Sequence, residues 1–341
     1  MLGVAWFHWS PKQWQGGFPF EIGLFFFFVL TGYLITGILL RERSKGEASG
    51  KPWRVSGILA FQTRRALRIL APYYAALALA WVVGATDVRE APWWYVFHLS
   101  NFRISAIGYW PAGTSQFWTL AVQQQFYVIW PLLIWFVPVR CLGPVIAVLG
   151  FLAPLWRLKC GLEGASGAPD LMPWMALDYL CTGSLLAWWV VARRGRLDHP
   201  RLLRAAWAAF AVYIVLHSLK VWATPVPGLR YFQQTFLSVA CAGLIARAFV
   251  RIRGPFGRAL DHPVLQHLGK LSYSLYLLHN LAPMAVGWVL PGLWSPAFDH
   301  GIGFIARLMV FALASWMLGY ASWLWIERPL ESVKSRVPTA L

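Results

Sequence analysis

Uncharged apolar stretches of about the length of a membrane-spanning helix recur along the whole sequence. Residues 22–40 and 117–139 are the clearest, with 19 and 23 residues, and a spanning helix needs about 20. The apolar fragment 1–9 is too short to cross and indicates a truncated first span. The pattern predicts an all-α polytopic transmembrane helical bundle of about ten spans. The remaining stretches cover residues 69–86, 141–156, 171–192, 205–219, 231–246, 271–291 and 308–326.

The composition excludes the main alternatives to a membrane protein. Charged residues make up 13% of the 341 residues and hydrophobic residues 58%, whereas soluble domains carry about 25% charged residues. Such a chain cannot cover a soluble fold of this size with polar surface, and it is too apolar to be disordered. We expect one membrane domain over residues 1–341. No metal is expected, because metal-ligand spacing is missing among Cys141, Cys160, Cys181 and Cys241.

The net charge of +17 follows the predicted spans and does not indicate a nucleic-acid surface. Of the 30 Lys and Arg residues, 22 lie in alternate loops that include residues 41–68, 193–204, 247–270 and 328–336, and 7 lie in the other loops. Two of these 7, Arg157 and Lys159, belong to a predicted outer loop at residues 157–170, and the remaining residue, Arg307, lies in or at the edge of the last span. Cytoplasmic loops of membrane proteins carry such an excess. We therefore expect the basic loops and both termini on the cytoplasmic side of a plasma membrane, and no nucleic-acid partner.

Three arginines stand where the third predicted span begins. Arg65 and Arg68 are three residues apart, so on a helix they share a face, and Arg64 is adjacent. Two guanidinium groups on one face form a bidentate site for phosphates. The alternative is that they only anchor the span at the cytoplasmic surface, and the spacing leaves both interpretations open.

Ionisable side chains within apolar stretches are costly in a bilayer, so they are candidates for function. His8 lies in an aromatic fragment. Its imidazole can act as a general base, since it titrates near neutral pH, or it can be a packed residue. Asp178 and His279 lie within predicted spans, and each is either a structural polar contact or part of a site.

The fourth predicted span opens with Trp118, and Gln123, Gln124 and Tyr127 follow within it. Side-chain amides at a membrane entrance need hydrogen-bond partners. These residues either line a polar cavity on the outer side or lie at the interface, and the sequence does not choose between the two.

Six blocks of the sequence, in order, resemble motifs of the acyltransferase 3 family, the integral-membrane acyltransferases that O-acetylate bacterial surface sugars. FFVLTGYLIT at residues 27–36 is similar to F-F-V-L-S-G-F-L-I-T. RRALRI at residues 64–69, with Pro72 and Tyr73, is similar to R-R-x-x-R-I-x-P-x-Y. The blocks extend over almost the whole chain. The other four lie at residues 118–131, 178–187, 268–279 and 326–329.

The resemblance implies an acyl-CoA donor, with acetyl-CoA foremost, at the cytoplasmic face of a bacterial inner membrane. It also implies a carbohydrate acceptor. It assigns Arg65 and Arg68, with Arg64 beside them, to the donor's phosphates. It assigns His8 to the position of the family's first-span histidine, the catalytic base.

The remaining matched positions are expected to bind the acceptor or to support the site. The expected acceptor-binding residues are Trp118, Gln123, Gln124 and Tyr127, and the expected supporting residues are Asp178, His279 and Glu327.

Three departures from the family's pattern bear on activity. The family's basic residue eleven positions before its first-span histidine has no counterpart, so we expect a mis-assigned start at Met1 or a truncated span. Gln123 and Gln124 replace paired glutamates, and an amide cannot take a proton at neutral pH. Phe25 stands where the family has an acidic residue.

Three functions therefore stay open at this level. The first is O-acyl transfer from acyl-CoA to a hydroxyl of a surface or lipid-linked carbohydrate. The second is an impaired family member that binds acyl-CoA or glycan without turnover, in keeping with the two glutamines. The third is a transporter, since charges within the membrane line many transport pathways, although the sequence lacks paired interrupted spans.

Overall fold

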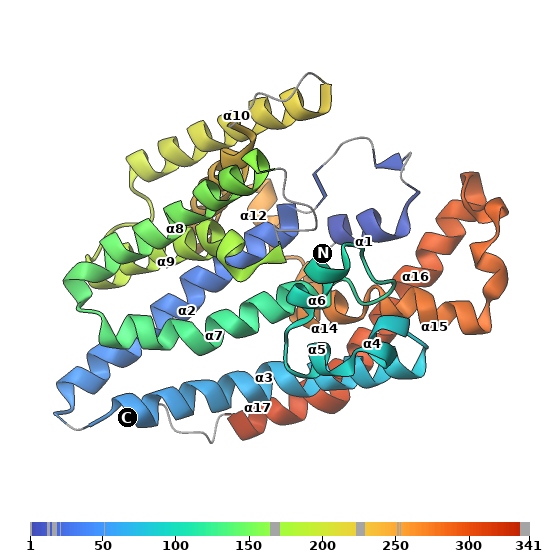
Figure 1. Cartoon of the computed structure of the whole chain (residues 1–341), viewed down its shortest axis with the longest axis horizontal. Helices are drawn as coiled ribbons and strands as arrows, with labels where there is room; N and C mark the ends of the chain where they lie inside the picture. Colours follow the sequence, from blue (N-terminus) through green and yellow to red (C-terminus); the bar gives the residue numbers. More distant parts are fainter. Residues whose placement is uncertain are drawn as a thin grey trace. The chain divides into compact units, whose positions relative to one another are not determined.

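A computed structural model of the chain consists of helices and their connections (Figure 1). It describes residues 2–334 apart from 12–13, 16–18, 21, 51, 164–170, 223–228, 251 and 253. None of these described residues forms a strand, which confirms the all-α prediction. The chain divides into two compact units. The first unit contains residues 1–21, 59–121 and 260–339, and the second contains residues 22–58, 122–259 and 340–341. The single domain over residues 1–341 stays a prediction.

The first unit is built around the long helix α3, most of which belongs to it, and around the C-terminal helices. Within it, α16 packs along α14 and α15. Its elements are α1 (Leu2–Trp9), α3 (Arg54–Val82), α4 (Thr86–Glu90), α5 (Pro92–Val96), α6 (Ser100–Ile107), α13 (Pro263–Lys270), α14 (Ser272–Leu278), α15 (Leu281–Val289), η5 (Pro291–Trp294), η6 (Pro296–Phe298), α16 (Gly301–Ser322), the π-helical turn η7 (Trp323–Glu327) and α17 (Arg328–Lys334).

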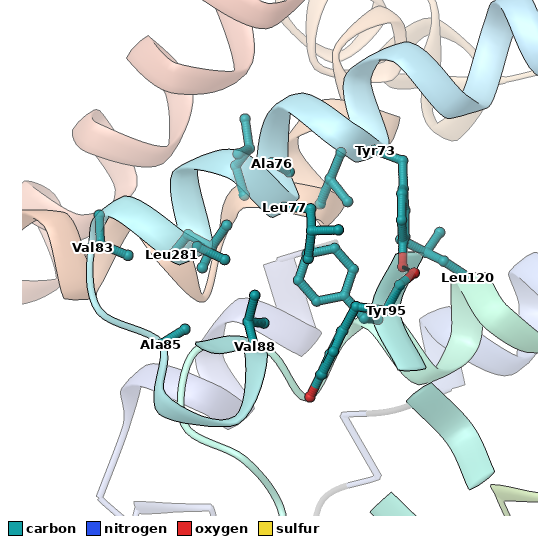
Figure 2. Packing of buried hydrophobic residues seen from close by; sticks show 13 residues of the cluster. Tyr73, Ala76, Leu77, Val83, Ala85, Val88, Tyr95, Leu120 and Leu281 are labelled. Atoms are coloured by element: carbon teal, nitrogen blue, oxygen red, sulfur yellow. Dashed lines mark hydrogen bonds between the residues drawn. The ribbon is translucent and has the colours of Figure 1, made fainter. Parts of the chain in front are cut away.

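Aromatic and aliphatic side chains from α3, α4, α5 and α14–α15 form the core of the first unit (Figure 2). Tyr73 of α3 is fully buried there and donates a hydrogen bond of 2.7 Å to the carbonyl oxygen of Tyr95. The Tyr95 hydroxyl donates in turn to Asp87, at 2.6 Å, and Arg103 forms a 2.8 Å ion pair with the same carboxylate. Burial and the bond to Asp87 raise the pKa of Tyr95, so the phenol stays a donor. This chain of contacts ties the short helices to the end of α3.

The second unit is a bundle in which α9 packs along α2 and α8 (Figure 1). The helix α11 packs along both α9 and α10. The helix α7 (Phe117–Phe136) begins in the first unit and continues in the second. The other elements of the second unit are α2 (Ile22–Ala48), α8 (Val139–Leu162), η3 (Pro173–Ala176), α9 (Leu177–Ala192), α10 (Pro200–Trp222), η4 (Leu229–Phe232), α11 (Gln233–Phe249) and α12 (Pro255–Leu260), whose last residue falls in the first unit.

Glycines allow α2 and α9 to approach closely. A Cβ atom on Gly32 would collide with the carbonyl oxygen of Leu180, and one on Gly183 would collide with that of Val29. Small residues serve this purpose in membrane helices, where backbones pack against each other without a hydrophobic driving force. Beside this crossing, Thr36 donates to Ser184 at 2.8 Å, so the interface also holds a buried polar contact.

Among the described residues, five helical segments are long and apolar enough to cross a membrane. This finding indicates a membrane protein, while the count of about ten spans and the cytoplasmic termini stay predictions. Residue 1 and the tail from 335 onward lie outside the described residues. The five segments are Ile22–Ala48, Val139–Leu162, Pro173–Ala192, Pro200–Leu219 and Gly301–Val333.

Three predicted boundaries differ from the structure. α2 continues to Ala48 and α3 begins at Arg54, so most basic residues of the predicted loop 41–68 lie on these two helices, with Arg64, Arg65 and Arg68 near the middle of α3. α8 continues to Leu162, which places Arg157 inside a helix and not in the predicted outer loop 157–170. Residues 164–170 of that loop lie outside the described residues. The predicted span 271–291 is two helices, because the chain turns between Leu278 and Leu281.

Candidate functional site

The break between α14 and α15 is a polar centre within the first unit. A helix that ends inside apolar surroundings leaves carbonyl groups without their usual amide partners. Here side chains supply the donors. Gln116 Nε2 donates to the Leu277 carbonyl at 3.0 Å, and Trp9 Nε1 donates to the His279 carbonyl at 3.1 Å. The break is thus a stable feature, held by α1 and by the segment that precedes α7.

The break carries His279, whose ring lies beside that of His8. The two ring centroids are 5.2 Å apart and the ring planes are inclined by 54°. His279 is fully buried, whereas His8 is exposed. The structure therefore brings together one predicted catalytic residue, the exposed His8, and one predicted supporting residue, the buried His279.

Polar neighbours that the sequence reasoning missed surround this histidine pair. Tyr276 exchanges a 2.7 Å hydrogen bond with Thr119, and its ring lies 5.5 Å from that of His279. Asn280 donates to Gln116 Oε1 at 3.0 Å and to Ser115 at 3.2 Å. The sequence carried only a weak signal for them: a His-Asn pair within the apolar stretch 271–291, and a Thr-Ser-Gln run before the predicted span 117–139. Neither pattern says which residues meet across the fold.

A pocket of about 390 Å³ lies in the same unit. Arg68 and Lys270 line it together with Glu327 and Glu331. Ser274 donates a short hydrogen bond to Glu327, which fixes that carboxylate. The remaining lining residues are Leu67, Gly269, Ser272, Tyr273, Trp323 and Leu330.

The three predicted donor-binding arginines do not all have the same surroundings. Arg68 is exposed and lines the pocket. The Arg65 guanidinium lies 5.4 Å from the centre of the Phe61 ring, in a cation–π contact, and Arg65 is not among the residues that line this pocket. Arg64 is half-buried on the same helix.

The predicted acceptor-binding residues lie on α7, between its second and its eleventh residue. Gln123 and Tyr127 are buried, at 4% and 5% exposure, in the second unit. Gln124 is half-buried, and its Oε1 atom is enclosed without a hydrogen-bond partner. Trp118 belongs to the first unit, where its ring lies 6.4 Å from that of Trp110. Their role in acceptor binding stays a prediction.

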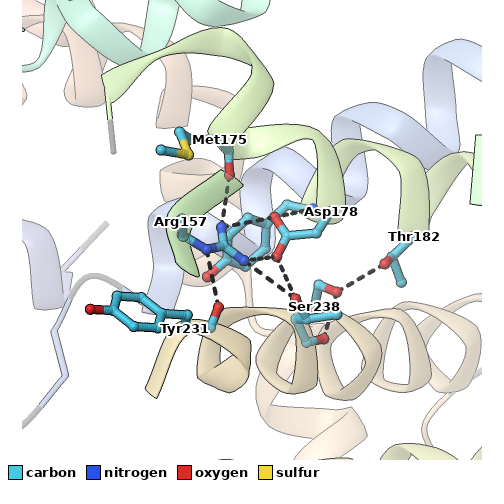
Figure 3. A network of polar contacts seen from close by, with 8 residues as sticks. Arg157, Met175, Asp178, Thr182, Tyr231 and Ser238 are labelled. Atoms are coloured by element: carbon cyan, nitrogen blue, oxygen red, sulfur yellow. Dashed lines mark hydrogen bonds and ion pairs between the residues drawn. The ribbon is translucent and has the colours of Figure 1, made fainter. Parts of the chain in front are cut away.

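Asp178 belongs to a closed polar network in the second unit (Figure 3). Its carboxylate pairs with Arg157 at 2.5 Å and accepts a hydrogen bond of 2.8 Å from Thr235, and both charged side chains are less than 5% exposed. Arg157 also donates to the carbonyls of Met175, at 2.8 Å, and Tyr231, at 3.2 Å. With its charges matched in this way, the network is suited to holding α8, α9 and α11 together.

Known proteins with similar sequences carry acetyltransferase names. The chain is 24% identical to the peptidoglycan O-acetyltransferase OatA of Listeria monocytogenes, over 97% of this chain and 54% of that protein. It is 26% identical to the Bacillus subtilis protein named "Putative peptidoglycan O-acetyltransferase YrhL", over 97% of this chain and 53% of that one. The chain thus spans about half the length of these curated relatives.

The family comparison covers nearly the whole chain, while no solved structure matches it significantly. The acyltransferase domain of the acyltransferase 3 family matches residues 1–328, a range that contains the histidine pair and most of the residues that line the pocket. This chain therefore belongs to the acyltransferase 3 family.

Proposed function

We propose that this chain is a membrane O-acyltransferase that moves an acetyl group from cytoplasmic acetyl-CoA to a carbohydrate hydroxyl on the outer side. Peptidoglycan is the proposed acceptor, because the relatives named above carry that substrate in their names. The observation that carries the proposal is the co-occurrence, in one compact unit, of an accessible imidazole and a pocket that Arg68 and Lys270 line together with two glutamates.

The pocket has the chemistry that the donor requires. Acyl-CoA is rich in phosphate, and phosphates bind to guanidinium and ammonium groups. Arg68 and Lys270 supply one of each. The carboxylates of Glu327 and Glu331 add acceptors for the hydroxyl and amine groups of a nucleotide. The lining also includes residues of three basic segments, 41–68, 247–270 and 328–336. The charge pattern assigns these segments to the cytoplasmic side, which supports a donor that binds from there.

The helix α14 runs from the pocket to the histidine pair. Ser272 lines the pocket, and His279 follows seven residues later. At 1.5 Å per residue, the two positions are about 10 Å apart along the helix axis. A donor whose phosphates bind at the pocket can extend its thioester along α14 toward His8.

His8 is the proposed general base. One ring nitrogen takes the proton of the acceptor hydroxyl as that oxygen attacks the thioester carbon. The new C–O bond forms and the C–S bond breaks. The departing thiolate then takes the proton from the imidazolium, which returns His8 to its starting state.

Labelled acetyl-CoA incubated with membranes that contain the protein tests this function. We expect label in the cell-wall glycan, and we expect His8→Ala to lower the rate by about 100- to 10,000-fold, the usual contribution of a general base. His199→Gln, a histidine substitution in the second unit, is the matched control and should leave the rate unchanged.

The other outcomes separate the competing functions. Saturable acetyl-CoA binding without label in glycan would indicate an impaired family member. Movement of a solute without acetyl transfer would indicate a transporter. Full activity of His8→Ala would refute the role of His8.

The donor pocket is tested separately by the double variant Arg68→Ala, Lys270→Ala. Loss of both cations should raise the KM for acetyl-CoA at least about tenfold, since hydrogen bonds to charged groups contribute about 1.5–3 kcal/mol each. Its effect on kcat should be small. An unchanged KM would place the donor elsewhere.

A further inference from the structure

We propose that His279 is a positioning residue for His8: it accepts a hydrogen bond from the His8 ring and so directs the other His8 nitrogen toward the acceptor hydroxyl. This inference rests on the proposed function. It adds a residue that acts through the base and not on the substrate.

The hydrogen bond of the His279 ring determines which of its nitrogens is available. Nδ1 lies 2.6 Å from the carbonyl oxygen of Tyr276. A carbonyl oxygen only accepts, so Nδ1 must carry the proton. In the neutral ring, Nε2 then bears the lone pair and is an acceptor. This nitrogen is enclosed and has no hydrogen-bond partner, and a buried acceptor of this kind is costly to leave unused.

The neighbouring ring of His8 offers the missing donor. Centroids 5.2 Å apart bring the ring edges within reach of a hydrogen bond, either direct or through one water. If one His8 nitrogen donates to His279 Nε2, the other His8 nitrogen is the base. Catalytic hydrogen bonds are often longer in a free enzyme and shorten when substrate binds.

The contacts of the break hold both rings in register. Trp9, the residue after His8, donates to the carbonyl of His279 at 3.1 Å. His279 therefore contacts α1 in two ways: its ring is the proposed acceptor for His8, and its carbonyl accepts the bond from Trp9. Tyr276, which holds Nδ1, is itself fixed by its 2.7 Å bond to Thr119. These contacts restrict rotation of the His279 ring, so its Nε2 atom keeps one direction.

The proton balance of the step is unchanged by this role. The hydroxyl proton moves to the free nitrogen of His8 and later to the thiolate. The proton on the other His8 nitrogen stays there and is shared with His279 Nε2. His279 stabilises the positive charge that develops on His8 in the transition state.

Two substitutions at position 279 separate orientation from simple packing. His279→Asn places an amide NH₂ where Nδ1 lies, so it can keep the bond to Tyr276 but offers no acceptor near Nε2. His279→Gln is longer and can place its amide oxygen near the Nε2 position. We expect His279→Asn to lower kcat about 100-fold, the cost of a misplaced catalytic group, with the KM for acetyl-CoA unchanged. His279→Gln should retain clearly more activity than His279→Asn.

Chemical rescue provides a second readout. His279→Ala leaves a space the size of an imidazole ring, and added imidazole should restore part of its kcat in a saturable manner. His199→Ala serves as the control and should respond to imidazole no more than the wild-type protein. The amount of each variant in the membrane fraction and its unfolding temperature in detergent are measured alongside.

The outcomes are distinct. Wild-type kcat in His279→Asn, or equal losses in His279→Asn and His279→Gln with no imidazole rescue of His279→Ala, would overturn the positioning role while leaving the proposed function intact. Absence of acetyl transfer by the wild-type protein would refute the proposed function and this inference together.

Discussion

At the scale of single residues, the sequence identifies buried ionisable groups better than it identifies their partners. Asp178 stands out as an acid in an apolar stretch. Its partner Arg157 was predicted to lie in an outer loop, because the apolar window ends at the first charged residue, whereas α8 continues past it. Residues from distant parts of the chain meet here through tertiary packing, and no local pattern encodes that meeting.

Removal of one partner of the buried Arg157–Asp178 pair should destabilise the second unit. Arg157→Ala leaves a buried carboxylate without its cation and should lower the free energy of unfolding by about 3–5 kcal/mol. Thermal unfolding in detergent measures this loss. Arg196→Ala breaks an exposed pair with Asp198 and is the control, with no measurable change expected. An equal, small effect of both substitutions would contradict the structural role.

At the scale of elements, the sequence predicted where helices lie but not how they are interrupted or packed. Each of the ten apolar stretches overlaps one or more helical segments among the described residues. The interruption at His279 escaped prediction because residues 278–281 contain no Pro or Gly to mark a break. The histidine pair depends on that interruption, so its geometry could not be derived from the sequence, although both histidines were singled out.

The close contact of α2 with α9 gives a prediction for its glycines. Gly183→Val would place side-chain atoms against the backbone of α2, and overpacking of this kind costs about 1–3 kcal/mol or more. We expect a lower unfolding temperature and less protein in the membrane. Gly292→Ala is the control, because an added Cβ there meets nothing within 4 Å. Normal stability of Gly183→Val would show that the two helices are further apart.

At the scale of the whole molecule, charge distribution is the information that the sequence provides about orientation. Among the described residues, five segments are clearly long and apolar enough to span. Others fall short because the chain is interrupted, as in α14 and α15, or because basic residues occupy the first half of the helix, as in α3. The topology therefore rests on the excess of Lys and Arg in alternate loops.

Cysteine labelling tests this orientation. In a variant whose four cysteines are replaced by alanine, Tyr109→Cys should react with a membrane-impermeant maleimide in intact cells. Asp198→Cys should react only after the membrane is permeabilised. Both original side chains are exposed, so accessibility within the fold does not limit the reaction. The reverse pattern would place the pocket on the outer side and contradict a cytoplasmic donor.

The single helix between the pocket and the histidine pair has a mechanical consequence. A seven-residue helix such as α14 behaves as a short rigid rod, and one end cannot shift by a residue's rise, about 1.5 Å, without carrying the other with it. A shift of α14 on binding of the nucleotide would therefore also move His279 relative to His8. In an enzyme with that linkage, the histidine pair would respond to whether the pocket is filled.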